Sequence, residues 1–159
     1  MKHVVFKPDQ TRAAIVTCGG LCPGLNVVIK SLVECLSFDY NVKEIWGVRW
    51  GYRGFYEDES YWIKLNPDNV RGIQNQGGTI LGSSRGGFKA AEIIENLKKR
   101  GINQLYLIGG DGTHRGIEAL NKELRENHKD YRLSICGVPK TIDNDISLID
   151  RSFGFNTSV

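Results

Sequence analysis

The chain has 159 residues, of which 40% are hydrophobic and 25% are charged. This balance is typical of one globular domain with its own core, and it excludes disordered, collagen-like and coiled-coil proteins. The net charge is only +3, and the basic residues are spread along the chain, which disfavours a nucleic-acid partner. Glycine is in excess, with 19 residues that gather mainly at 19–24, 47–54, 72–87 and 109–116. Such clusters predict loops that approach a ligand closely.

Neither a membrane span nor a secretory signal is predicted. The longest uncharged stretch, between Arg12 and Lys30, is broken by glycine and proline. The amino terminus has no apolar segment after its first charges, so we expect a cytoplasmic protein with no membrane partner. The cysteines match neither a zinc site nor a paired CxxC motif, which favours four free thiols: Cys18, Cys22, Cys35 and Cys136.

The first half of the chain begins with a strand, a loop and a helix. Residues 13–17 are a short apolar run that ends in two glycines, and apolar positions over 25–36 then repeat at helical spacing. A second strand is predicted over 42–48. Pro67 is typical of the first turn of a short helix. Residues 75–87 are rich in glycine and serine, which predicts a loop.

The second half repeats this alternation. Residues 88–100 predict an amphipathic helix that ends at Gly101, and residues 104–108 predict a buried strand. Another helix follows the glycines at 109–113, and 131–138 is the next strand. We therefore expect an α/β fold of the doubly wound, Rossmann-like three-layer type, with a mostly parallel sheet and helices on both faces. Ligands of such sheets bind at the carboxyl ends of the strands.

Three polar segments each follow a predicted strand directly: CGGLCPG at 18–24, GGDGT at 109–113 and PKTIDND at 139–145. We expect them to meet along one edge of the sheet. The first segment has the glycine spacing of a P-loop, but Leu25 and Asn26 occupy the lysine and hydroxyl positions, which excludes a Walker A site. Two interpretations remain, an anion site at a helix amino terminus or a tight turn without a ligand.

Charged residues in these loops suit phosphoryl transfer. Asp111 could hold Mg²⁺ beside substrate phosphates, or could only cap the next helix. Of Asp143 and Asp145, one could take a proton from a hydroxyl while the other holds the metal, although the same residues are common in surface turns. Arg85 could neutralise a transferring phosphoryl group, or could be a solvated cation. Together these residues describe a kinase that lacks a P-loop.

The segments CGGLCPGLN, GTILGSSRGG, IGGDGT and PKTIDND, in this order and spacing, resemble the phosphofructokinase family across residues 12–159. The sequences of these segments are most similar to those of the plant and trypanosomatid type of ATP-dependent enzyme. The resemblance implies a nucleotide-binding lobe preceded by an extension at 1–11 and truncated before a second, sugar-phosphate lobe. Asn156 or Thr157 looks like the N-cap of a further helix, so we expect an amino-terminal part of something longer.

The resemblance implies an activity as well: phosphoryl transfer from MgATP to the 1-hydroxyl of D-fructose 6-phosphate in glycolysis, by an enzyme that is a homo-oligomer when full length. Asp143 would be the general base, and Arg85 the second catalytic residue. Magnesium would be held by Asp111 and Asp145. The sugar phosphate would be bound by Thr141, Ile142 and Asp143. The nucleotide would be bound by Gly20, Tyr52, Arg85, Gly86, Gly110, Asp111, Gly112 and Thr113.

The phosphoryl donor is a choice between ATP and pyrophosphate. Pyrophosphate enzymes of this family carry a carboxylate at the position of Gly112, so this small residue favours ATP. Lys140 matches the lysine of pyrophosphate enzymes, but plant-like ATP enzymes carry it too. A regulatory subunit without activity is a further alternative. An NAD-dependent oxidoreductase is disfavoured because the dinucleotide fingerprint is missing, and because Arg49 and Trp50 stand where an acidic residue is needed.

Overall fold

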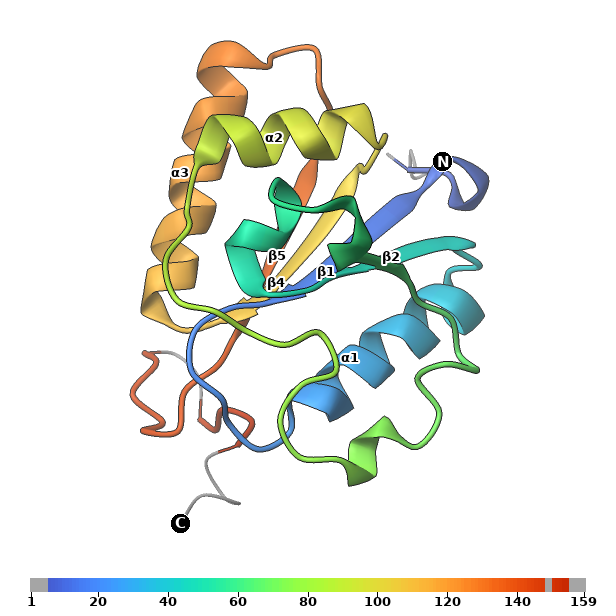
Figure 1. Cartoon of the computed structure of the whole chain (residues 1–159), viewed down its shortest axis with the longest axis vertical. Coiled ribbons are helices and arrows are strands. Elements are labelled where there is room, and N and C mark those ends of the chain that lie inside the picture. Colours follow the sequence, from blue (N-terminus) through green and yellow to red (C-terminus); the bar gives the residue numbers. More distant parts are fainter. Residues whose placement is uncertain (1–5, 148–149, 155–159) are drawn as a thin grey trace.

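The computed structural model describes residues 6–147 and 150–154. Its middle layer is a five-stranded sheet in the order β3-β2-β1-β4-β5 (Figure 1). The neighbouring pairs β2–β1, β1–β4 and β4–β5 are parallel, and β3 joins the β2 edge antiparallel. The strands are β1 (Arg12–Thr17), β2 (Glu44–Val48), β3 (Trp62–Lys64), β4 (Gln104–Gly109) and β5 (Ser134–Pro139).

Helices cover both faces of this sheet. Helix α1 (Leu25–Glu34) lies on one face, and α2 (Ala90–Lys99) and α3 (Asp111–Asn127) lie on the other (Figure 1). The doubly wound α/β fold predicted from the sequence is therefore confirmed. Short 3-10 or π-helical turns occupy Pro8–Gln10, Cys35–Asp39, Gly51–Phe55, Glu59–Tyr61 and Ile73–Asn75.

Strand β1 is the centre of the sheet and serves two cores. Ala13 and Ile15 point into the core against α1, whereas Ala14 and Val16 point into the core against α2 and α3. This alternation follows from the two-residue period of a strand. Because both faces are covered, the strand is apolar on both sides, and every residue after Arg12 is buried.

Two expectations about element boundaries are wrong. Pro67 opens a turn and no helix, because the Asn66 side-chain oxygen accepts hydrogen bonds from the backbone N–H groups of Asp68 and Asn69 and competes with helical pairing. Strand β5 begins at Ser134, three residues later than Tyr131, whose N–H still bonds the carbonyl of His128 at the end of α3. The helix expected at Asn156 or Thr157 lies outside the described residues.

Other local expectations agree with the structure. Gly101 has φ +68° at the end of α2, where its N–H bonds the carbonyl of Lys98 and the N–H of Ile102 bonds the carbonyl of Leu97. This is a Schellman ending, in which glycine accepts the left-handed conformation at no steric cost. All four cysteines are free thiols. Among the described residues, no helix has both the length and the apolar character to cross a membrane.

Candidate active site

The connections of the sheet create a crevice between β1 and β4. The chain leaves β1 through α1 toward β2 on one side, and later returns to place β4 on the other side of β1. The loops after β1 and β4 therefore diverge to opposite faces, and doubly wound proteins bind ligands at such a switch point. Figure 1 shows the loops that follow β1, β4 and β5 gathered at one end of the sheet.

A cavity of about 410 Å³ lies at this point. It brings together seven residues predicted from the sequence: Gly20, Tyr52, Arg85, Gly86, Gly110, Gly112 and Thr113. Sequence reasoning did not select the other lining residues as site residues for this chain: Cys18, Gly19, Ser84, Phe88 and Lys140. Asp111, Thr141, Ile142, Asp143 and Asp145 are not among the lining residues.

Lys140 is the buried cation of the cavity, with a relative exposure of 9%. Its ammonium group donates a hydrogen bond to the carbonyl of Gly20, and so joins the end of β5 to the turn after β1 across β4. Burial lowers the pKa of Lys140. The neighbouring Cys18 thiol has its pKa raised to about 12 by burial, so it is a neutral wall of the cavity and no nucleophile.

The amino terminus of α3 forms the opposite wall. The first helical bond closes from the His114 N–H to the carbonyl of Gly110, which leaves the N–H groups of the first turn free of helical partners. With the helix dipole they form a site for an anion. Asp111 is the first residue of α3 and is exposed, and it makes no side-chain capping bond. A Cβ placed on Gly112 would meet nothing within 4 Å, so this position opens into free space.

Arg85 is exposed at the tip of the loop that closes the cavity, and its Nη2 lies 3.6 Å from where a Cβ of Gly20 would stand. This loop is hydrogen-bonded to the turn after β1. Ser83 Oγ donates to the carbonyl of Gly19 (2.6 Å), and the Gly19 N–H donates to the carbonyl of Ser84 (3.1 Å). The guanidinium is therefore carried on a backbone that is fixed relative to the turn after β1.

Asn26 anchors the start of the same loop. Its side-chain nitrogen donates to the carbonyl of Gln76 (3.0 Å), and its oxygen accepts from the N–H of Ile80 (2.8 Å). The residue is 2% exposed. In the sequence, Asn26 only excluded a P-loop; in the fold it connects α1 to the loop that carries Arg85.

Tyr52 lines the cavity and bonds the first turn of α3. Its hydroxyl donates to the carbonyl of Thr113 (3.2 Å), its ring meets Phe88 edge-on at 5.0 Å, and it is 6% exposed. Gly116 on α3 has no room for a side chain because the Tyr52 hydroxyl fills that space. Tyr52 thus contributes a ring to the cavity wall while its polar end is used within the protein.

The segment after Lys140 forms a separate polar turn. Thr141 Oγ1 donates to Asp145 Oδ1 (2.9 Å) and accepts from the N–H of Asp143 (3.1 Å). Asp143, Asp145 and Ile142 are exposed. Within the described part of the chain, the carboxylate of Asp143 has no hydrogen-bond or ion-pair partner.

The carboxylates of the site suit magnesium better than zinc. Among residues 6–147 and 150–154, no three His, Cys, Asp or Glu side chains gather in a way that could hold a metal. Magnesium needs only one or two carboxylates when phosphate oxygens and water complete its shell. Asp111, an exposed carboxylate at the amino terminus of α3, fits that donor set.

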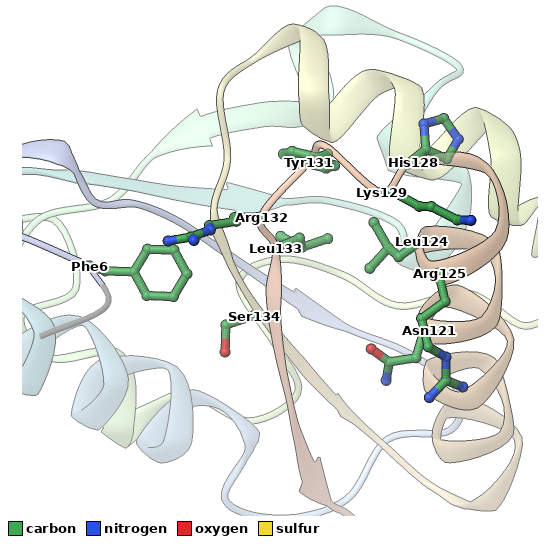
Figure 2. Close-up of a pocket in the computed structure, with 10 residues that line it drawn as sticks. All are labelled: Phe6, Asn121, Leu124, Arg125, His128, Lys129, Tyr131, Arg132, Leu133 and Ser134. Carbon is green, nitrogen blue, oxygen red and sulfur yellow. The ribbon is translucent and has the colours of Figure 1, made fainter. Parts of the chain in front are cut away.

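A larger cavity, of about 820 Å³, lies at the other end of β5 (Figure 2). It opens between the end of α3 and the start of β5, with Leu124, Tyr131 and Leu133 in its middle. Its charged lining is basic, and it contains none of the glycine loops. It borders β5, which has a neighbouring strand on one side only among the described residues. The smaller cavity is the functional candidate, because it holds the anion-binding groups.

The site thus belongs to an α/β protein with glycine loops and a helix amino terminus at the switch point of its sheet, and with no P-loop. The phosphofructokinase family model matches residues 12–159, and the chain belongs to this family. It is 51% identical to ATP-dependent 6-phosphofructokinase 7 of Arabidopsis thaliana, an alignment that covers 99% of the chain and 32% of that protein. It is 47% identical to ATP-dependent 6-phosphofructokinase of Borreliella burgdorferi, with 99% and 35% covered.

Solved structures agree with this assignment. Phosphofructokinase of Pichia pastoris in the T-state superposes with a TM-score of 0.83 at 29% identity, covering 93% of the chain and 17% of that structure. A pyrophosphate-dependent phosphofructokinase of Marinobacter aquaeolei has a TM-score of 0.78 at 21% identity, over 91% and 37%, and shares the fold. The chain spans about a third of the length of the curated relatives it matches.

Proposed function

We propose that this chain is the nucleotide-binding lobe of an ATP-dependent 6-phosphofructokinase, which transfers the γ-phosphoryl group of MgATP to the 1-hydroxyl of fructose 6-phosphate. One observation carries the proposal. The cavity at the switch point combines the free amides of α3, the buried Lys140 and the exposed cation of Arg85, and these groups suit a chain of phosphates. The curated relatives named above are ATP-dependent enzymes.

On the donor side, Gly20, Gly110, Gly112 and Thr113 would bind the nucleotide through backbone groups and the Thr113 hydroxyl. Gly86 and Arg85 would close over the phosphates, and Tyr52 would face the nucleotide from the cavity wall. Lys140 adds a second cation, in place of its bond to Gly20. Cations fixed in a partly enclosed site stabilise the charge of the transferring group more than they would in water.

On the acceptor side, Thr141 and Ile142 would meet the sugar phosphate. Asp143 takes the proton of the 1-hydroxyl, and the oxygen then bonds to the γ-phosphorus as the bond to the leaving ADP oxygen breaks. The turn holds Asp143 through its N–H bond to Thr141 and leaves its carboxylate free. Asp111 and Asp145 would hold Mg²⁺, which neutralises phosphate charge when bound.

A test of the general base is Asp143→Asn in the polypeptide expressed from its whole reading frame. We expect kcat to fall by about two to four orders of magnitude, while MgATP affinity stays the same, since only proton transfer is removed. Asp68→Asn, an exposed carboxylate far from the cavity, is the matched control and should keep full activity. Full activity of Asp143→Asn contradicts the assignment.

Two alternatives make different predictions for the same preparation. A pyrophosphate-dependent enzyme is favoured by Lys140, whose ammonium group is already buried in the cavity; it would use pyrophosphate and ignore ATP. A regulatory subunit would bind MgATP and show no turnover with either donor. The open space at Gly112 favours ATP over pyrophosphate, because it leaves room for the rest of the nucleotide.

The proposal includes a cytoplasmic location and a homo-oligomer of the full-length enzyme that is completed by a second, sugar-phosphate lobe after this one. Residues 1–11 are proposed as an extension, and the family match begins at residue 12. Two of the Arabidopsis relatives are named as chloroplastic, so the location needs its own measurement. Light scattering of the polypeptide expressed from the whole reading frame tests the oligomer, and a monomer would contradict it.

A further inference from the structure

Trp50 has a conformation that its residue type does not favour. Its φ is +65° and its ψ is +34°, in the left-handed region, and Gly51 follows with φ +65°. A bulky residue in this region is strained and persists only where the surroundings hold it. Trp50 is also 41% exposed, so burial in the core does not explain its place.

The surroundings that hold Trp50 are the residues before Arg85. The Trp50 N–H donates to the carbonyl of Leu81 (2.9 Å), and its own carbonyl accepts from Ser84 Oγ (2.6 Å). The indole lies on Gly82: a Cβ there would be 2.6 Å from the ring. One residue therefore contacts three of the four positions that precede Arg85.

The opposite side of this short segment is fixed by the turn after β1. Ser83 and Ser84 bond the backbone of Gly19, as described above. The segment is thus held between Trp50 and Gly19, and Arg85 follows with its guanidinium beside Gly20. Gly82 has φ +63°, and its N–H and carbonyl bond Thr79 and Thr17, so the indole adds a side-chain contact to a backbone that is already hydrogen-bonded.

We propose that Trp50 is a positioning residue: its indole and its peptide groups hold residues 81–84 against the turn after β1, so that Arg85 points at the donor phosphates. This inference rests on the proposed function, because it assigns Arg85 to the phosphates of the donor. Trp50 itself does not line the cavity. Its effect on a ligand must pass through the loop.

Trp50→Asn tests the proposal, because asparagine accepts the left-handed backbone and removes only the ring. We expect MgATP to bind about tenfold more weakly, as expected when one charge-assisted hydrogen bond is misplaced, while adenosine affinity is unchanged. Trp50→Phe, which restores an aromatic face over Gly82, should recover most of the affinity. Phe38→Asn, an aromatic residue 70% exposed on the π-helical turn, is the matched control and should bind normally.

A double-mutant cycle separates positioning from a general structural role. In an Arg85→Ala background, Trp50→Asn should change MgATP affinity by less than about twofold, because the group that it positions is gone. Equal losses in both backgrounds, or no loss in Trp50→Asn alone, would overturn the proposal.

Amide hydrogen exchange without nucleotide tells the inference apart from the proposed function. Trp50→Asn should speed exchange over residues 81–87, and Trp50→Phe should restore protection. Unchanged exchange overturns the role of Trp50 even if MgATP binds to the unaltered protein. If the unaltered protein fails to bind MgATP, the proposed function is wrong, and so is the proposal that Trp50 positions Arg85 for the donor phosphates.

Discussion

Gly112 and Lys140 show how single residues set the chemistry of the cavity. Gly112 does not contribute to packing, since a Cβ there would contact no other group. Because glycine has no side chain, the position stays open and uncharged. Lys140 is the reverse case, a charge held in a buried position by one carbonyl group. Neither residue is explained by packing within the lobe alone.

Gly112→Asp should lower MgATP affinity by more than about tenfold, because the new carboxylate would lie beside phosphates at a helix amino terminus. The fold should tolerate it, as the position is open. Titration calorimetry checks the prediction, with Gly112→Ala as the control for volume without charge. Unchanged ATP binding and kinetics in Gly112→Asp would refute the steric and electrostatic argument for ATP.

Lys140 should make stability depend on pH. Its pKa is lowered in the folded protein, so between that value and the ordinary 10.5 the unfolded chain binds more protons than the folded one. Stability due to this group therefore rises as pH rises through that window. Urea unfolding at several pH values should show this rise as the difference in stability between the unaltered chain and Lys140→Met. Cys18, Tyr52 and Tyr131, whose pKa values are raised by burial, lower the stability of both proteins over the same pH range. Parallel pH profiles for the two proteins would contradict the prediction.

At the scale of elements, the loop of residues 76–87 is the part of the site that depends most on side-chain anchors. It has no helix or strand of its own, and its backbone bonds are supplied by Asn26, by the loop's own threonine and by Thr17, whose hydroxyl donates to the carbonyl of Gly82 (2.7 Å). Trp50 and Tyr56 also bond the loop, so apart from its own threonine the loop is ordered by residues that lie 31 or more positions away in the sequence.

Asn26→Ala should destabilise the protein by about 2 kcal/mol, because it removes the buried side chain that pairs with the Gln76 carbonyl and the Ile80 N–H of the loop. Urea unfolding measures the loss. Asn103 is the matched control, since it also bonds two backbone groups, the Arg12 N–H and the Gln10 carbonyl, but at a half-buried position where both bonds are exposed. An equal loss in Asn103→Ala would contradict the role of burial.

The central elements of the fold were predictable, and the reasons are local. Strands β1 and β4 are short apolar runs followed by glycine, and α2 has a clear amphipathic period with a glycine end. Strand β3 was missed because it has only three residues and pairs with β2 at the sheet edge. The prediction of a helix at Pro67 was wrong because the preference of proline for the first turn of a helix takes no account of the side-chain hydrogen bonds of Asn66.

The site was predictable on its glycine side and less so on its polar side. Glycine loops that follow strands predict a backbone that approaches a ligand, and most of the glycines predicted for the site do line the cavity. The burial of Lys140 depends on its reach across β4 to Gly20, and the roles of Asn26 and Trp50 depend on contacts with a distant loop. The spacing of residues in a sequence motif does not predict contacts between such distant segments.

At the scale of the whole molecule, the donor and acceptor groups differ in how they are built. The cavity proposed for the donor includes the cations Lys140 and Arg85 in its lining, whereas Asp143 and Asp145 lie on an exposed turn. Strand β5 ends the described sheet with an uncharged run, SICGVP, and the relatives are about three times as long as this chain. We therefore expect the chain alone to bind nucleotide without transferring phosphate to the sugar.

Calorimetric titration of this chain with MgATP, pyrophosphate and NAD tests the central claim most directly. The account predicts one MgATP site, which weakens in Gly112→Asp and in Arg85→Ala, with little heat from pyrophosphate and none from NAD. Tight binding of NAD, or binding of pyrophosphate in place of MgATP, would contradict it.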